Sequence, residues 1–312
     1  MSGTPPPDGE RIVAFDGALD LRRTLGIHGR GRYDPTIRFE VSGSAWRATR
    51  TADGPVTLFI ERVSGGVQAR AWGPGSAVAL ASLEAFIGLD DDPSALVPVH
   101  PAVADALRRL PGLRIGRSGA VLEALLPAIL EQKITGEEAR RVYGNLIRVH
   151  GEAAPGPPGL RLQPSPETLA ALPYHAYHPL GLERRRAELI RAVARDAARL
   201  ERLAASAGGP GADPGPAYAA LRAYPGIGPW TAAEVGARAF GDPDAVSLAD
   251  VHLPNMVAWA LAGEPRGTDE RMLELLEPYR GQRGRVLRLL ELSGAEAPRR
   301  GPRMATRRIE RL

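Results

Sequence analysis

The first part of the chain alternates between apolar and polar positions with a period of two. Four such runs follow one another between residues 36 and 72, and turn signals such as Ser42-Gly43 separate them. Alternation with this punctuation predicts an antiparallel meander. The predicted strands are Thr36–Val41, Ala45–Thr51, Val56–Val63 and Val67–Trp72. Residues 1–10 are rich in Pro and Gly and are expected to be loose.

Beyond about residue 89 apolar positions recur every three to four residues, which predicts helices. Two further helical stretches, Leu19–Leu25 and Ala77–Leu89, flank the meander. We therefore predict an α+β protein, with a small N-terminal antiparallel β-sheet domain with helices at 1–88 and an all-α domain at 89–312. A Pro-rich stretch, 151–166, interrupts the helices, and an arginine-rich tail follows Glu296. The predicted helices of the second domain are Ala102–Leu110, Val121–Gln132, Glu137–His150, Glu167–Ala171, Arg184–Ala207, Ala217–Ala223, Thr231–Phe240, Pro254–Ala262, Arg271–Leu276 and Arg285–Leu292.

Composition narrows the class of protein. Of the 312 residues, 44% are hydrophobic and 24% are charged, as is typical of a soluble protein of about two domains. No apolar run reaches the ~20 residues of a membrane-spanning helix, and no basic segment followed by an apolar core starts the chain. A cytoplasmic location without a membrane partner is therefore expected.

Cysteine, a common metal ligand, is absent from the sequence, and almost all basic residues are arginine. The absence of cysteine excludes disulfides, thiolate zinc sites and cysteine-bound iron–sulfur clusters, and we expect neither a metal nor a cofactor. The net charge is +4, and Lys133 is the only lysine among 40 basic residues. Arginine is permanently charged and grips phosphates with two donors, so this composition is compatible with a polyanionic partner.

A short turn between two predicted helices is the first candidate for chemistry. Pro225-Gly226-Ile227-Gly228 separates the helices at 217–223 and 231–240. The two glycines allow a tight turn, Ile227 is expected to face inward, and Pro229 can start the next helix. Such a turn presents backbone N–H groups that suit one phosphate of DNA. The alternative is a helix connection that binds no ligand.

Asp250 is the second candidate. It lies 22 residues after Gly228, in a loop ahead of the helix that Pro254 can start, and can return to the mouth of the turn. An aspartate ahead of a helix is most often a cap, which is the alternative interpretation. Asp242 and Asp244 compete with it, but their turn around Pro243 suits a structural role.

Together these segments resemble the helix-hairpin-helix (HhH-GPD) DNA glycosylase superfamily, and within it the 3-methyladenine DNA glycosylase II (alkylbase glycosylase) branch. The turn and Asp250 carry the resemblance, with LEALLPAILEQKITGEEARRVYGNLIRVHG (122–151), GLERRRAELI (181–190) and the N-terminal meander. The resemblance implies base excision repair: a protein that flips an alkylated purine out of duplex DNA and hydrolyses its N-glycosidic bond with Asp250. Members that also cut the strand use a lysine where this chain has Trp230, so the resemblance implies a glycosylase without lyase activity.

The resemblance also implies roles for single residues. Trp230, Gln132 and Glu234 are the expected substrate pocket, although relatives often have an aromatic residue in place of Glu234. The expected DNA contacts are Gly226, Ile227, Gly228, Thr231 and Lys133, the last as the wedge that fills the gap left by the flipped base.

The expected partner is double-stranded DNA with a damaged base, bound by a monomer. Structural roles remain alternatives for Trp230, Gln132, Lys133 and Glu234. Two other functions also stay open: a glycosylase for a different damaged base, and a non-catalytic module that binds damaged DNA.

Overall fold

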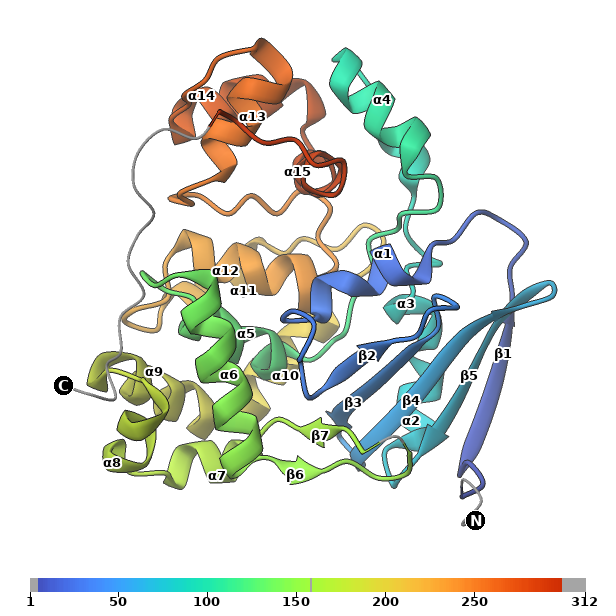
Figure 1. Ribbon diagram of the computed structural model, residues 1–312, viewed down its shortest axis with the longest axis vertical. Helices are drawn as coiled ribbons and strands as arrows, with labels where there is room; N and C mark the ends of the chain where they lie inside the picture. Colours follow the sequence, from blue (N-terminus) through green and yellow to red (C-terminus); the bar gives the residue numbers. More distant parts are fainter. Residues whose placement is uncertain (1–4, 158, 299–312) are drawn as a thin grey trace.

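The computed structural model describes residues 5–157 and 159–298, so the arginine-rich tail lies outside the described residues apart from its first positions. The N-terminal part is a five-stranded antiparallel sheet with the strand order β1-β5-β4-β3-β2 (Figure 1). The strands are β1 (Gly9–Ala14), β2 (Ile37–Phe39), β3 (Ala45–Thr51), β4 (Gly54–Val63) and β5 (Gly66–Trp72). Four of them confirm the predicted meander. The expectation of a loose N-terminus was wrong from Gly9 onward, because β1 pairs along its whole length with β5.

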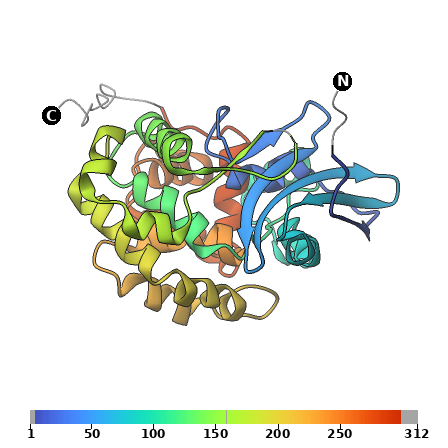
Figure 2. The ribbon, with the colours of Figure 1, turned by 90° about the horizontal axis from the view of Figure 1, so that it is seen from below.

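Helices cover one face of the sheet. The apolar side chains of α1 (Leu21–Leu25), α2 (Ser76–Ala81) and α3 (Leu83–Phe86) form one core with the inward residues of β3, β4 and β5. The opposite face meets a short hairpin of β6 (Glu152–Ala153) and β7 (Arg161–Leu162), where Leu160 and Leu162 pack on Ala48. The sheet lies beside the helical part (Figure 2).

The rest of the described chain is helical apart from that hairpin. Its α-helices are α4 (Pro101–Arg109), α5 (Val121–Leu130), α6 (Gly136–His150), α7 (Pro166–Ala171), α8 (Tyr174–Tyr177), α9 (Arg184–Arg195), α10 (Ala197–Ala207), α11 (Gly215–Arg222), α12 (Pro229–Val235), α13 (Leu253–Ala262), α14 (Asp269–Leu276) and α15 (Arg283–Leu292). Short 3₁₀ turns lie at Gly26–His28, Pro93–Ala95, His178–Leu180 and Glu277–Tyr279.

Three of the predicted helices are interrupted. The stretch 77–89 breaks at Ser82 into α2 and α3, and the stretch 184–207 breaks at Asp196 into α9 and α10. The stretch after Trp230 changes to a π-helical turn at Gly236–Phe240. No helix among residues 5–157 and 159–298 is long and apolar enough to cross a membrane.

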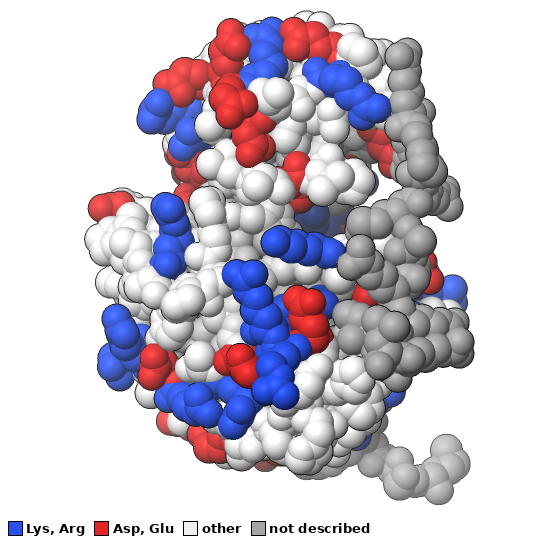
Figure 3. Space-filling view, turned by 90° about the vertical axis from the view of Figure 1, so that its left-hand side faces the viewer, with Lys and Arg blue, Asp and Glu red and all other residues white. Residues whose placement is uncertain are grey.

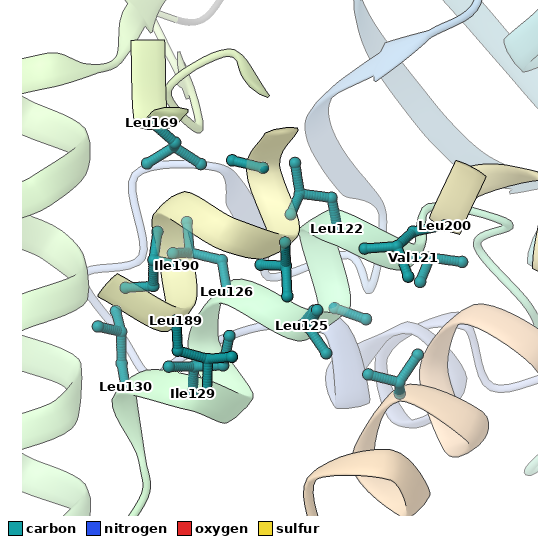
Figure 4. Packing of buried hydrophobic residues seen from close by; sticks show 14 of the residues in the cluster. Val121, Leu122, Leu125, Leu126, Ile129, Leu130, Leu169, Leu189, Ile190 and Leu200 are labelled. Carbon is teal, nitrogen blue, oxygen red and sulfur yellow. The ribbon is translucent and has the colours of Figure 1, made fainter. Parts of the chain in front are cut away.

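The helices form two cores. The larger one surrounds α5, which is buried at every position except Glu123, and includes Leu125, Ile129, Leu189 and Ile190 (Figure 4). The smaller core joins α4 to α13, α14 and α15, which form the upper group in Figure 1. Because a helix that is apolar all round must be enclosed, α5 fixes the relative positions of the elements around it.

Buried polar contacts join the sheet part to the helical part. The Arg47 guanidinium on β3 contacts Glu123 on α5 at 2.7 Å, and Arg238 Nε donates to the Ile27 carbonyl at 3.0 Å. His28 lies at the same junction, and its ring Nε2 is buried without a hydrogen-bond partner among the described residues. Burial, followed by the charges of Arg47 and Arg238, lowers the pKa of His28 well below 6.5.

This junction predicts a pH-dependent stability. The unfolded chain protonates His28 near its ordinary pKa, whereas the folded chain keeps it neutral, so stability is present above about pH 6.5 and declines as the pH falls. The decline from this one residue is at most about 1.4 kcal/mol per pH unit. We expect His28→Gln to flatten the fall in the free energy of unfolding between pH 7 and 5.5, measured by urea denaturation. His175→Gln, at an exposed histidine, is the control; equal slopes for the two variants would contradict the prediction.

Candidate active site

The turn between α11 and α12 is built as a tight hairpin. The Ile227 N–H donates to the Tyr224 carbonyl at 3.0 Å, and Gly226 has a φ of +107°, which favours glycine. A Cβ at Gly226 would lie 3.1 Å from Leu189 Cδ2, whereas a Cβ at Gly228 would meet open space. The side chain of Ile227 is buried in the large core, so only its backbone is available to a ligand. The first N–H groups of α12 have no acceptor within the helix and point out of this turn.

Gln132 ties this hairpin to the end of α5. Its Nε2 donates to the Gly226 carbonyl and to the Thr231 hydroxyl, both at 3.0 Å. Thr231 is only 2% exposed. Gln132, expected in the pocket, and Thr231, expected on the DNA surface, therefore bind each other behind the hairpin.

Trp230 and Asp250 meet directly. The indole Nε1 donates to Asp250 Oδ2 at 3.0 Å. The other oxygen, Oδ1, accepts from the backbone N–H groups of His252 at 2.7 Å and Leu253 at 3.0 Å. Asp250 thus caps the first turn of α13 with one oxygen and faces α12 with the other. The two interpretations of this aspartate, cap and site residue, are geometrically compatible.

The competing aspartates are engaged elsewhere. Asp242 accepts a hydrogen bond from the Tyr218 hydroxyl at 2.5 Å, and Asp244 is paired with Arg283. Both also line a cavity of about 930 Å³, together with Ala232 and Ala233 of α12. Asp250 and Trp230 are not among the residues that line this cavity.

Glu234 lies one turn beyond Trp230 on α12 and is largely buried. Its Oε2 contacts Arg238 Nη1 at 2.7 Å, and its Oε1 accepts from the Ser247 hydroxyl at 2.7 Å. Burial alone would raise the pKa of this carboxyl, but Arg238, Ser247 and Arg30 together hold it below its ordinary value. Arg238 and Ser247 were not predicted from the sequence. The i, i+4 spacing of Glu234 and Arg238 could have revealed the first, whereas no local signal marks the second.

Lys133 occupies the turn between α5 and α6, next to Gln132. It is exposed and has a φ of +57°, a left-handed conformation that strains a residue with a Cβ. Figure 3 shows the molecule from the left-hand side of Figure 1. On this face Lys and Arg side chains gather in the middle, below the upper helical group. Backbone strain at an exposed turn beside a candidate site is typical of functional positions.

Comparison with known proteins identifies a family for part of the chain. Residues 126–280, from α5 to the end of α14 and just beyond it, match the model of the HhH-GPD superfamily of base excision DNA repair proteins. This part of the chain belongs to the HhH-GPD superfamily. The match contains the hairpin, Gln132, Trp230 and Asp250.

Relatives of this HhH-GPD chain include two Mycobacterium tuberculosis proteins, from different strains, each described as a probable bifunctional transcriptional activator/DNA repair enzyme AlkA. Each is 30% identical over 181 residues, which is 56% of this chain and 35% of the relative. The chain therefore spans about a third of the length of the curated relatives it matches.

Solved structures share the fold over most of the chain. A 3-methyladenine DNA-glycosylase from Archaeoglobus fulgidus has a TM-score of 0.72 at 20% identity, covering 90% of this chain and 97% of that one. An 8-oxoguanine glycosylase/lyase from Clostridium acetobutylicum has a TM-score of 0.68 at 13% identity, covering 93% and 98%. At these identities the likeness shows a common fold, including the N-terminal sheet followed by helices.

The strained turn predicts different effects of two substitutions on stability. Lys133→Gly removes the left-handed strain, and we expect the free energy of unfolding to rise by up to about 1 kcal/mol, net of the extra freedom of glycine in the unfolded chain. Lys133→Ala keeps the Cβ and should give no such gain. Denaturant unfolding of both variants checks this, and equal stabilities of the two would count against strain at Lys133.

Proposed function

We propose that this protein is a DNA glycosylase of base excision repair that removes alkylated purines of the 3-methyladenine type from duplex DNA by hydrolysis. The contact between the Trp230 indole and Asp250 carries the proposal, because it places a flat aromatic ring and a carboxylate side by side at the mouth of the hairpin. Membership of the HhH-GPD superfamily supports the same reaction class.

The residues divide the task between holding DNA and breaking one bond. The backbone N–H groups of Gly228 and of the start of α12 bind a phosphate, and Lys133 enters the gap when the damaged nucleotide leaves the stack. The flipped base lies against Trp230, whose π face attracts the positive charge of an alkylated purine.

Asp250 acts on the sugar. As the N-glycosidic bond breaks, C1′ gains positive charge, and the carboxylate stabilises this charge at short range. The alkylated base departs with the bonding electrons and becomes neutral, and water then adds to C1′ and gives its extra proton to solvent. Three N–H groups, from Trp230, His252 and Leu253, hold the carboxylate in place before the reaction begins.

Strand cleavage is not part of the proposed reaction. A lyase forms a Schiff base between a lysine and the sugar. The corresponding position in the hairpin helix is Trp230, and the one lysine of the chain, Lys133, lies in the turn between α5 and α6. We expect hydrolysis to leave an abasic site in an intact strand.

A glycosylase for a different damaged base is the second candidate. The observation that favours it is the pairing of Glu234 with Arg238 and Ser247, which neutralises the charge of Glu234. Relatives that bind a cationic base often have an aromatic residue at this position. The polar cluster here suits a base that is recognised by hydrogen bonds.

Base release from DNA is the decisive experiment. Methylated duplex DNA and duplexes with single deaminated or oxidised purines are incubated with the wild type, Asp250→Asn and the control Asp242→Asn, whose side chain faces Tyr218. We expect the wild type and the control to free 3-methyladenine, and Asp250→Asn to be at least about 100-fold slower. Strand breaks should appear only after hot alkali.

Each other outcome is informative. Release from a deaminated or oxidised duplex alone would replace the first candidate by the second. Breaks without alkali would contradict the absence of lyase activity. DNA binding without release of any base would contradict the glycosylase and favour a non-catalytic module.

Lys133 fills the gap with its stem and reaches a phosphate with its ammonium group, so its removal predicts a change in salt dependence. The loss of one phosphate contact lowers the slope of log affinity against log salt by about 0.9. We expect Lys133→Ala to show this smaller slope in fluorescence anisotropy titrations with an abasic duplex. Arg108→Ala, at an exposed arginine of α4, is the control and should leave the slope unchanged.

A further inference from the structure

The residue immediately before Asp250 has a strained backbone. Ala249 has a φ of +63°, and Ala249 and Lys133 are the two non-glycine residues with positive φ among residues 5–157 and 159–298. This conformation costs more for alanine than for glycine, because the Cβ approaches the following carbonyl. Such strain persists only where surrounding contacts impose it.

A carboxylate contacts this strained backbone directly. Oδ2 of Asp269, the first residue of α14, accepts the Ala249 N–H at 2.7 Å. A hydrogen bond to a charged acceptor is among the strongest in proteins, and this one fixes the peptide group that precedes Ala249. Oδ1 of Asp269 is buried and has no hydrogen-bond partner among the described residues. Among the described residues, the Asp269 carboxylate therefore bonds only to the backbone N–H of Ala249, the residue before Asp250.

The loop before α14 lies directly on the first turn of α13. The Gly267 N–H donates to the Asn255 side chain at 3.1 Å, and a Cβ at Gly267 would come within 2.4 Å of the Pro254 carbonyl oxygen. Asp250 Oδ1 caps the same turn of α13. Because this loop packs closely on α13, it holds Asp269 next to Ala249.

We propose that Asp269 is a positioning residue for Asp250. By holding Ala249 in the left-handed conformation, it sets the direction in which the chain enters Asp250, and with it the position of Oδ2 beside Trp230. When Asp269 is removed, Ala249 relaxes to an unstrained conformation and the carboxylate turns away from the sugar. This role rests on the proposed glycosylase function.

Four variants test the role. Single-turnover base release, with enzyme in excess over damaged duplex, is measured for Asp269→Ala, Asp269→Asn, the double variant Asp269→Ala/Ala249→Gly, and Glu270→Ala. Asp269→Ala should be about 10- to 100-fold slower, the effect of a small displacement of a catalytic group, with an unchanged dissociation constant for DNA. Asp269→Asn keeps an acceptor oxygen and should lose less.

The double variant Asp269→Ala/Ala249→Gly separates a positioning role from a structural one. Because glycine takes positive φ without strain, Ala249→Gly should restore most of the rate lost in Asp269→Ala. A residue that merely stabilises α14 would not be rescued in this way. Glu270→Ala removes a charge from the same helical turn without touching Ala249, and should keep the wild-type rate.

The outcomes separate this role from the function on which it rests. A wild-type rate in Asp269→Ala, an equal loss in Glu270→Ala, or a slowed Asp269→Ala that glycine at 249 does not rescue would each overturn the role of Asp269 alone. A wild type that binds DNA and releases no base from any duplex of the panel would overturn the proposed function, and this role with it.

Discussion

The geometry of the site depends on one amide group. Gln132, at the end of the enclosed helix α5, holds both the Gly226 carbonyl and the Thr231 hydroxyl. Through these two bonds the position of α5 in the core determines where the hairpin turn and the start of α12 lie. Lys133 is the residue after Gln132. The Gln132 amide therefore also sets the distance between Lys133, the proposed wedge, and the proposed phosphate site at the hairpin. A buried core and a surface site are in this way parts of one rigid arrangement.

Asp250 links the fold to the proposed chemistry in a similar way. Its Oδ1 completes the first turn of α13, and its Oδ2 faces the indole of Trp230 on α12. The carboxylate therefore spans the seam between the two helical cores, with α12 in the larger and α13 in the smaller. A group held by three donors from both sides of a seam has little freedom to reorient, which is what electrostatic catalysis requires.

The sequence predicted those elements whose conformation depends on residues close together in the chain. Strands β2–β5 follow from alternation, and the hairpin follows from its glycines. Strand β1 was missed because its inward positions are Gly9, Arg11 and Val13, which make no apolar run, while the apolar Ile12 is exposed. The break at Asp196 lacks a Gly or Pro signal. The bond between Ala249 and Asp269 joins residues 20 positions apart in different elements, and nothing in either local sequence indicates it.

The cluster of Glu234, Arg238 and Ser247 constrains how this protein can evolve. An aromatic residue at position 234 would strand the Arg238 charge in a largely buried place and leave the Ser247 hydroxyl without its acceptor. Each single step toward an aromatic pocket therefore passes through a less stable protein. We therefore expect the three positions to be coupled, so that an aromatic residue at 234 is tolerated only when Arg238 and Ser247 are replaced with it.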